Sequence, residues 1–367
     1  MGNVESADAF SGVDELKEAL SDLETRLASI EAGHRQALRD AELDAANMDG
    51  PGGLRPSDAS LGGGGLIMCG ATLRCDRAVR IVVGPIIGKV TGDRARVLLE
   101  VDKDTEVACH VCLVDDSCPQ GRQVAEVRMR MRARRPGVFQ LAKLVPGERY
   151  VACFSGVCRD DAVERVADFQ SLPLHDHELR FLAVSGDRPE AVVAGEFNLW
   201  ETIFERVRQR HLPRVGVMIH SGGQVHMQQA FEDAWVLLRR HAEYMDTGAG
   251  VDTTKGGEGA AWIALEEEAA ERLRAAYRFS WNLPFTRETL ASVPHLMVPA
   301  DCDIYPNFNR HQDLFPETGG FVGAAMLRLC RRVYWEYQRQ LWDPAVPEMI
   351  AEDEEKVSVT HHAPPQQ

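Results

Sequence analysis

The chain has few features that would take it to a membrane or to nucleic acid. Its longest apolar runs, such as Ile81–Ile87, are far shorter than the ~20 residues that a membrane-spanning helix needs. Positive charge is also scarce, because 41 Lys and Arg residues face 56 Asp and Glu residues and give a net charge of −15. Nucleic acid is therefore not an expected partner, since contacts with phosphates need clustered Lys and Arg. The 44% hydrophobic content is that of a soluble globular protein.

The N-terminus is polar and acidic and does not resemble a secretory signal. We therefore expect a cytoplasmic protein in which the nine cysteines are reduced thiols. The first six residues fit the acylation pattern M-G-x-x-x-[ST], which would place a myristoyl group on Gly2. A single acyl chain holds a protein at a membrane only marginally, so a peripheral membrane location is expected only if Gly2 is acylated. The alternative is an unmodified, disordered segment over residues 1–11.

Residues 12–40 carry apolar side chains at intervals of three and four, separated by charged residues. The positions are Val13, Leu16, Leu20, Leu23, Leu27 and Ile30. This heptad pattern predicts a coiled-coil-like helix through which the chain would form a homodimer. The alternative is a single amphipathic helix that packs on the body of the protein. Residues 41–75 are rich in glycine and are predicted to be a flexible linker.

Residues 76–173 alternate apolar and polar side chains with a period of two. Short strands separated by turn residues are predicted at Arg80–Val83, Ala95–Val101, Val107–Val114, Gln123–Met131, Val138–Leu144 and Tyr150–Ser155. No helical pattern interrupts this series. Such spacing is typical of a β-sandwich of about 100 residues.

From residue 177 to residue 345 the pattern becomes that of an α/β domain. Buried strands are predicted at Leu179–Ser185, Val215–His220 and His295–Val298, and helices at Phe197–Arg210, Gln228–His241, Ala260–Phe279 and Gly323–Trp342. Strands that alternate with helices indicate a parallel sheet covered by helices. The acidic and then Pro/Gln-rich residues 346–367 are predicted to be disordered. The expected fold class is thus α/β with an all-β domain in front.

Ligands of open α/β sheets bind beyond the carboxyl ends of the strands. Three segments follow the predicted strands: Ser185–Glu190, Ser221–His226 and Pro299–Ile304. Together they offer carboxylates, imidazoles and one thiol for chemistry at this edge of the sheet.

In this order the segments resemble those of the PhoD-like metallophosphatases, a group of the calcineurin-like phosphoesterases. The start of the β-rich region, Val83–Thr91, is similar to the domain that precedes the catalytic domain in this family. Further similarity lies in Tyr277–Trp281 and in Val333–Pro344, which is similar to the family's Y-x-x-Y-Q-x-x-L helix. The resemblance covers most of residues 80–345 and implies a two-metal centre that hydrolyses phosphate esters, with iron, calcium or zinc as the ions.

Several ligand positions of that family are altered here. The family's H-x-G-D-Q-x-Y has Gly223 in place of its Asp and His226 in place of its Tyr, and Gln228 stands where a carboxylate often follows. The family's D-D-H-[DE] has Ala300 and Cys302 in place of the first Asp and the His. The family's later strand, which ends in G-D-x-H, has no counterpart in this sequence.

The ligand positions that remain are Asp187, His226, Asp301 and Asp303, to which His220 and Cys302 could add donors. Such a set could hold a zinc-like ion. The structural alternative is that Asp187 and Asp301 cap helices or turns and that Cys302 is a small buried residue.

Two other groups of residues have a functional and a structural interpretation. Cys109 and Cys112, with Cys118, Cys153 and Cys158, have the spacing of a metal knuckle. Residues i and i+3 of a strand point to opposite faces, however, so buried thiols are expected. Residues Arg128–Arg135 hold five arginines, several of which alternation would place on one solvated face of a strand, where they could meet an acidic partner or a phosphate. The structural alternative is an exposed edge strand.

The sequence therefore leaves three classes of function open. The first is a phosphatase-like domain that is catalytically impaired and acts as a binding or scaffold protein. The second is an active phosphomonoesterase or phosphodiesterase with altered metal ligands. The third is an incomplete product without a function of its own.

Overall fold

The computed structural model describes residues 66–68, 70–115, 118–174, 179–209, 214–246, 257–304, 320–343 and 345. Gly2, the predicted helix over residues 12–40, most of the predicted linker and the tail lie outside these residues, so acylation and dimerisation through the helix stay predictions. None of the helices within the described residues is both long and apolar enough to cross a bilayer.

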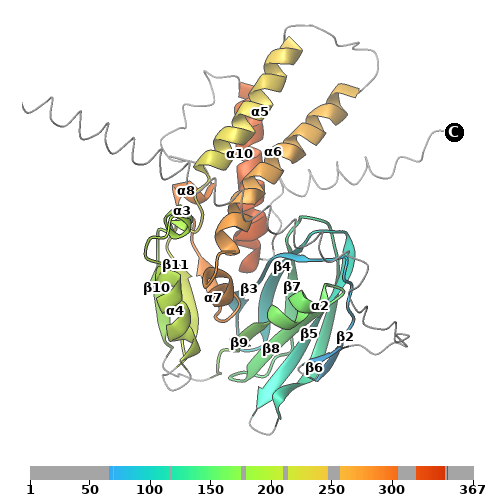
Figure 1. Ribbon diagram of the computed structural model, residues 1–367, viewed down its shortest axis with the longest axis vertical. Helices are drawn as coiled ribbons and strands as arrows, with labels where there is room; N and C mark the ends of the chain where they lie inside the picture. The colour runs from blue at the N-terminus through green and yellow to red at the C-terminus, as the bar shows by residue number, and fades with distance from the viewer. Residues whose placement is uncertain are drawn as a thin grey trace, which may run out of the picture. The chain divides into compact units, whose positions relative to one another are not determined.

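The β-rich region consists of two antiparallel sheets and a small hairpin (Figure 1). The three-stranded sheet has the order β3-β4-β7 and the four-stranded sheet the order β6-β5-β8-β9. The strands are β3 (Ile81–Val90), β4 (Arg94–Val101), β5 (Thr105–Asp115), β6 (Cys118–Met131), β7 (Gly137–Ala142), β8 (Arg149–Ser155) and β9 (Ala167–Gln170), and the hairpin is β1 (Leu66–Met68) with β2 (Ala71–Leu73). The six predicted strands correspond to β3 through β8.

The two sheets pack face to face around a continuous apolar core. Val97 and Phe139 of the first sheet share this core with Val111 and Phe154 of the second, and all four side chains are almost fully buried. In β4 the alternation places Ala95, Val97, Leu99 and Val101 in this layer, as the period of two predicts. The expectation of an uninterrupted series of strands was wrong, because helix α2 (Arg159–Glu164) lies between β8 and β9. Its buried Asp161 accepts the N–H of Ile81 at 2.9 Å.

Cys109 and Cys112 are both buried in this core, as expected for structural thiols. The register between β5 and β6 shifts between Val111 and Cys112 and skips Val124, so the β-bulge lies on β6, whereas β5 keeps a regular register with β8. Exposed residues still alternate with half-buried ones over residues 122–130 of β6, and Arg128 and Arg130 are exposed, as predicted.

The second part of the protein contains a parallel sheet of three strands in the order β10-β11-β12. The strands are β10 (Phe181–Val184), β11 (Val217–His220) and β12 (His295–Met297). Helix α3 (Pro189–Val193) and helix α4 (Leu199–Arg208) follow β10, and Trp200 of α4 packs with Met218 of β11 in a small core. Helix α7 (Thr286–Leu290) precedes β12, and α8 (Asp301–Ile304) follows it.

Three long helices form a bundle next to this sheet (Figure 1). They are α5 (Gln228–Asp246), α6 (Gly257–Trp281) and α10 (Gly320–Tyr337). Helix α10 ends at Tyr337 instead of Trp342, and a 3-10 turn, η1 (Arg339–Leu341), follows. This early end places Gln338 in the interior, where its amide donates to the Tyr277 hydroxyl at 3.0 Å. The turn η1 packs directly on Gly88 of β3, where a Cβ would lie 2.3 Å from the carbonyl oxygen of Leu341.

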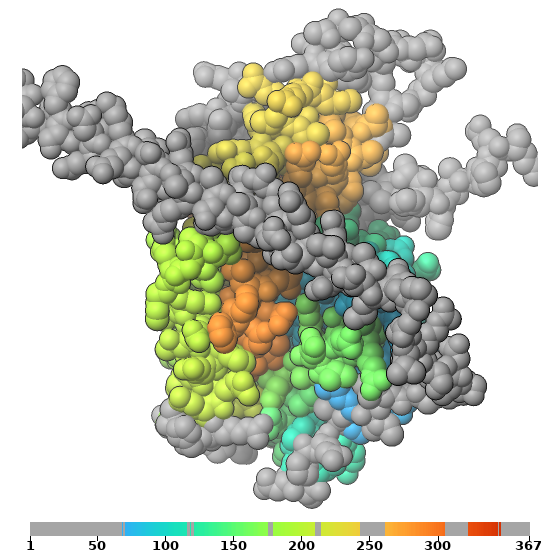
Figure 2. Space-filling view, viewed as in Figure 1, coloured from blue at the N-terminus to red at the C-terminus, as the bar shows by residue number. Residues whose placement is uncertain are grey.

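The β-rich region and the helices share a second core. Val83, Ile86 and Leu98 from β3 and β4 pack with buried residues of α5, α6 and α10. A network of buried charges adds to this interface: Glu100 of β4 accepts from Nε of Arg278 at 2.7 Å and from the hydroxyl of Tyr337 at 2.5 Å. In Figure 2 the orange surface of the α7 region lies between the β-rich region and the yellow-green surface of β10, α4 and β11. The structure is thus an α/β fold with a β-rich region.

Candidate functional site

The three segments that the sequence predicts to carry chemistry do come together. The N–H of Gly186 donates to the carbonyl of Gly222 at 3.0 Å, and that of Asp187 donates to the carbonyl of Gly223 at 2.7 Å. The third segment contacts the second through Ala300. Its Cβ lies only 2.5 Å from the position that a Cβ on Gly222 would take. The loops after β10, β11 and β12 therefore meet at the carboxyl edge of the sheet, where open α/β sheets bind ligands.

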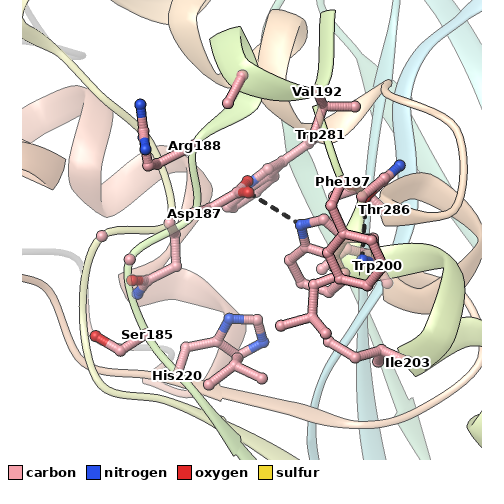
Figure 3. A pocket seen from close by; sticks show the side chains of 18 of the residues that line it. Ser185, Asp187, Arg188, Val192, Phe197, Trp200, Ile203, His220, Trp281 and Thr286 are labelled. Atoms are coloured by element: carbon pink, nitrogen blue, oxygen red, sulfur yellow. Dashed lines mark hydrogen bonds between the residues drawn. The ribbon is translucent and has the colours of Figure 1, made fainter. Parts of the chain in front are cut away.

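A pocket of about 230 Å³ opens at this edge (Figure 3). Its polar lining includes Ser185, Asp187, Arg188 and His220, and its apolar wall is built from Trp200, Phe197, Ile203, Val192, Leu199 and Trp281. The wall comes largely from α3 and α4, which follow β10 directly. A few polar groups on a mostly apolar wall are typical of small-molecule sites.

Asp187 is the half-buried one of the two carboxylates that line the pocket, and the other, Glu196, is exposed. Oδ1 of Asp187 accepts a hydrogen bond from the indole Nε1 of Trp200 at 3.0 Å (Figure 3). Its Oδ2 is buried and has no hydrogen-bond partner among the described residues. Burial raises the pKa of Asp187, and the hydrogen bond from Trp200 opposes this effect. Asp187 can therefore still accept one strong hydrogen bond from a ligand.

His220 lies at the base of the pocket and forms a hydrogen bond with a second buried imidazole. Its Nε2 lies 2.8 Å from Nδ1 of His295, and Nε2 of His295 lies 3.3 Å from the carbonyl of Thr289. Because a carbonyl only accepts, His295 carries its proton on Nε2 and accepts at Nδ1 from His220. The remaining nitrogen of His220, Nδ1, then has a lone pair. Burial lowers the pKa of both side chains, that of His295 to about 4, so both are neutral at pH 7.

The side chain of Asp303 forms a clamp that holds the loops after β11 and β12 together. Its Oδ1 accepts the N–H groups of Gln224 and Val225 at 2.7 and 2.9 Å. Its Oδ2 accepts those of Gly223 and Ala300 at 2.7 and 2.8 Å. The side chain is fully buried. Each carboxylate oxygen therefore holds two backbone donors that would otherwise be buried without an acceptor.

The other predicted ligand positions lie around this clamp. Nδ1 of His226 is 3.7 Å from a carboxylate oxygen of Glu190, and His226 is near enough to Asp187 to lower the pKa of that carboxyl group. Asp301 begins the short helix α8, and Cys302 follows it with a half-buried thiol whose pKa is raised by burial. Gln228 turns away from the loops and donates to Glu232 at 3.2 Å. Within the described residues, no three His, Cys, Asp or Glu side chains are placed to hold one metal ion.

The backbone itself occupies the space next to Gly223. This residue has a φ of +74°, and a Cβ at this position would lie 2.9 Å from Cα of Gly186. An aspartate, which the resembling family has here, would need both a left-handed backbone and a shift of the neighbouring loop. The residues present therefore do not fit the family's two-metal centre.

Sequence reasoning missed three residues that shape the pocket, namely Trp200, Thr286 and His295. The asparagine at 198 was a signal for Trp200, because its side chain caps α4 by accepting from the N–H of Trp200 at 3.0 Å. That cap places Trp200 in the first helical turn, facing the strand ends. His295 starts its strand, and no local pattern indicates that it meets His220.

No family model and no curated protein matches the chain. Among solved structures it is similar to PhoD, with 13% identity, a TM-score of 0.44 and coverage of 70% of this chain and 45% of PhoD. The chain thus spans less than half of the PhoD chain. It is also similar to the sensor domain of the anti-sigma factor RsgI4 of Pseudobacteroides cellulosolvens, with 14% identity, a TM-score of 0.18 and coverage of 26% of this chain and 96% of that domain. The PhoD-like assignment therefore stays a prediction.

Proposed function

We propose that this chain is a PhoD-like domain that binds a small ligand at the carboxyl edge of its parallel sheet and does not hydrolyse phosphate esters. The clamp at Asp303 carries this proposal. A metal ion that took this carboxylate as a ligand would compete with four backbone N–H groups, and each donor left buried without a partner costs about 1–3 kcal/mol.

The conformation of Gly223 supports the same conclusion. A two-metal centre needs carboxylates from several strand ends, one of them bridging the ions. Here the sequence differs from the family at Gly223, Ala300 and Cys302, and the loop contacts leave no room for a Cβ at Gly223. Of the predicted metal-binding set, Asp303 is engaged by four backbone N–H groups, which leaves Asp187, His226 and Asp301.

The pocket beside these loops keeps features of a binding site. Oδ2 of Asp187 and Nδ1 of His220 are acceptors, and Trp200 supplies an aromatic surface next to them. We therefore expect a ligand with a hydrogen-bond donor or an amine that meets Asp187 and an apolar part that packs on Trp200.

An active hydrolase with altered ligands is the second candidate. The observation that favours it is Asp187, whose Oδ2 has no partner among the described residues and which lies near His226, a possible second metal ligand. In that case iron, calcium or zinc would be expected and a phosphate ester would be the substrate. A scaffold that dimerises through residues 12–40 is compatible with either candidate.

The two candidates differ in metal content and turnover. We expect the purified full-length chain, supplied with iron, calcium or zinc, to hold no stoichiometric metal and to leave p-nitrophenyl phosphate and bis-p-nitrophenyl phosphate intact. Bound metal with turnover that is lost in Asp301→Ala and Asp187→Asn, but kept in Asp160→Ala on the exposed side of α2, would overturn the proposal.

Ligand binding is tested separately with benzylamine as the probe. Its ammonium group matches the acceptor on Asp187, and its ring matches the wall at Trp200. We expect saturable binding by calorimetry that is lost in Asp187→Asn and kept in Asp160→Ala. Equal binding to all three proteins would count against this pocket.

A further inference from the structure

A second cavity, outside the site described above, separates the β-rich region from the parallel sheet. It measures about 770 Å³ and is lined by β9 and the end of α2 on one side and by α4 and α7 on the other. Its position is fixed by a backbone hydrogen bond of 2.9 Å from Asp168 of β9 to the carbonyl of Ala291, just after α7. We call this cavity the arginine groove.

The arginine groove is positive although the protein is acidic. Five guanidinium groups line it, from Arg149, Arg165, Arg208, Arg214 and Arg287. Three carboxylates, Glu164, Asp168 and Glu288, oppose them, which leaves an excess of two positive charges in a chain with a net charge of −15. A cluster of positive charges in a protein with a negative net charge indicates that the cluster has a local role.

Two of the three carboxylates of the groove already form hydrogen bonds with three of its arginines. Asp168 accepts from Nε of Arg149 at 2.9 Å and from Arg214 at 3.1 Å, so one carboxylate serves two cations. Glu288 accepts from Arg287 at 2.6 Å. Each of these arginines still has N–H donors that can bind a further anion.

Arg165 and Arg208 lack a carboxylate partner within the described part of the chain. Arg165 donates to the carbonyl of Gly84 over 3.4 Å, and Arg208 lies over the ring of Phe204 at 5.2 Å. Burial and the nearby charge of Arg287 lower the pKa of Arg165, whereas the carboxylates of Asp161, Glu164 and Glu288 raise it. Arg165 thus lies near a second guanidinium group, and an anion between Arg165 and Arg287 would be attracted by both.

We propose that the arginine groove binds a small molecule with a phosphate or diphosphate group. The group lies between Arg165 and Arg287, with Arg208 and Arg214 closing the site from α4 and the start of β11. Planar guanidinium forks match phosphate oxygens in pairs, which favours arginine over lysine in such sites. A cavity of this volume has room for a nucleotide-sized ligand.

The test is calorimetric titration of the full-length protein with pyrophosphate and with ADP. Sodium chloride of equal ionic strength serves as the reference, because salt screens unspecific attraction. We expect saturable binding of pyrophosphate and weakening by about tenfold or more in Arg165→Gln and in Arg287→Gln. The control Arg130→Gln, on the solvated face of β6, is expected to bind like the unaltered protein. Tighter binding of ADP than of pyrophosphate would identify the ligand as a nucleotide.

A second measurement separates a ligand site from a structural role. Removing the charge of Arg165 removes both its repulsion from Arg287 and its attraction to Asp161, Glu164 and Glu288, so Arg165→Gln is expected to leave the midpoint of thermal unfolding without ligand nearly unchanged while it weakens binding. A lowered midpoint together with unchanged pyrophosphate affinity would assign Arg165 a structural role and overturn the proposal. Binding that is absent in the unaltered protein, or equal in Arg165→Gln, Arg287→Gln and Arg130→Gln, would also overturn it.

Discussion

One hydrogen bond joins the neutral imidazoles of His220 and His295 beneath the pocket, and it makes the stability of the fold depend on pH. In the unfolded chain these side chains titrate near pH 6.5, whereas burial lowers the pKa of folded His295 to about 4. Between these values the unfolded state binds more protons, so stability falls as the pH falls through this window. The loss amounts to about 3 kcal/mol at the lower end and is absent above pH 6.5.

Urea unfolding at several pH values measures this dependence. In His295→Gln the slope below pH 6.5 should become shallower, since one of the two buried imidazoles no longer titrates. Stability of the same variant at neutral pH reports the cost of repacking alone. An unchanged slope would show that these two histidines do not govern the acid sensitivity of the fold.

The substitution Gly223→Asp tests whether the loops have room for the aspartate that the resembling family has at this position. Gly223→Asp puts a side chain at a φ of +74° and a Cβ 2.9 Å from Cα of Gly186. The backbone strain alone costs about 1–2 kcal/mol, and the contact adds to it. We therefore expect a clear loss of stability in urea unfolding without any gain in bound metal.

Gly195→Asp is the matched control for that substitution. Gly195 has a φ of +81°, but a Cβ there would meet nothing within 4 Å. The two variants share the strain of the backbone and differ in the contact with Gly186. If Gly223→Asp cost no more than Gly195→Asp, or if it bound metal, the loops would have room for the missing ligand.

At this scale the sequence predicts which segments meet but not how their side chains are used. The rule for strand ends brings together the loops of Asp187, Gly223 and Ala300. The clamp by Asp303 could not be predicted, because its donors at Gly223, Gln224 and Val225 lie about 80 residues earlier in the chain. Such a role depends on the approach of two loops in space and leaves no local pattern.

At the scale of the elements, none of the described helices and strands covers one apolar face of the parallel sheet. Phe181 of β10 is 59% exposed, Leu296 of β12 is 38% exposed, and Val298 after β12 is 59% exposed. Phe181 and Leu296 are linked through register with Val217 and Ile219 on the same face of β11. Because parallel sheets are usually buried on both faces, this face is expected to bind hydrophobic dyes and to promote self-association.

Phe181→Thr combined with Val298→Thr should reduce both effects. The two changes touch exposed positions, so unfolding free energy is expected to shift by less than about 1 kcal/mol. Dye fluorescence and light scattering measure the outcome, and Val124→Thr, at a single 48% exposed position on β6, is the control. Equal dye binding by all variants would show that this face is not the site of dye binding and self-association.

The lengths of the elements explain which of them the sequence predicts. Strands β3 to β8 hold six to fourteen residues and show several periods of alternation. Helix α2 has six residues and β9 has four, which is too short for either period to stand out. The end of α10 at Tyr337 was missed for another reason: burial of Gln338 against Tyr277 outweighs a helical pattern that continues to Trp342.

For the whole molecule, buried charge ties the β-rich region to the helices. Glu100 of β4 is fully buried and holds Arg278 of α6 and Tyr337 of α10, whereas Glu106 of β5 pairs with Arg128 in solvent. Removing one charge of a buried pair costs about 3–5 kcal/mol, while an exposed pair contributes about 0–1 kcal/mol. Glu100→Gln keeps the shape of the side chain but removes its charge and replaces one of its two acceptor oxygens with an NH2 group.

Glu100→Gln should therefore destabilise the protein by about 3 kcal/mol and Glu106→Gln by less than about 1 kcal/mol. Because Glu100 joins the two parts, its substitution should also make them unfold less cooperatively. Urea unfolding followed by tryptophan fluorescence, which reports on Trp281 of the helical core, and by circular dichroism should then give separate transitions. Coincident transitions in Glu100→Gln would show that the apolar core around Val83, Ile86 and Leu98 is sufficient to hold the two parts together without the charges.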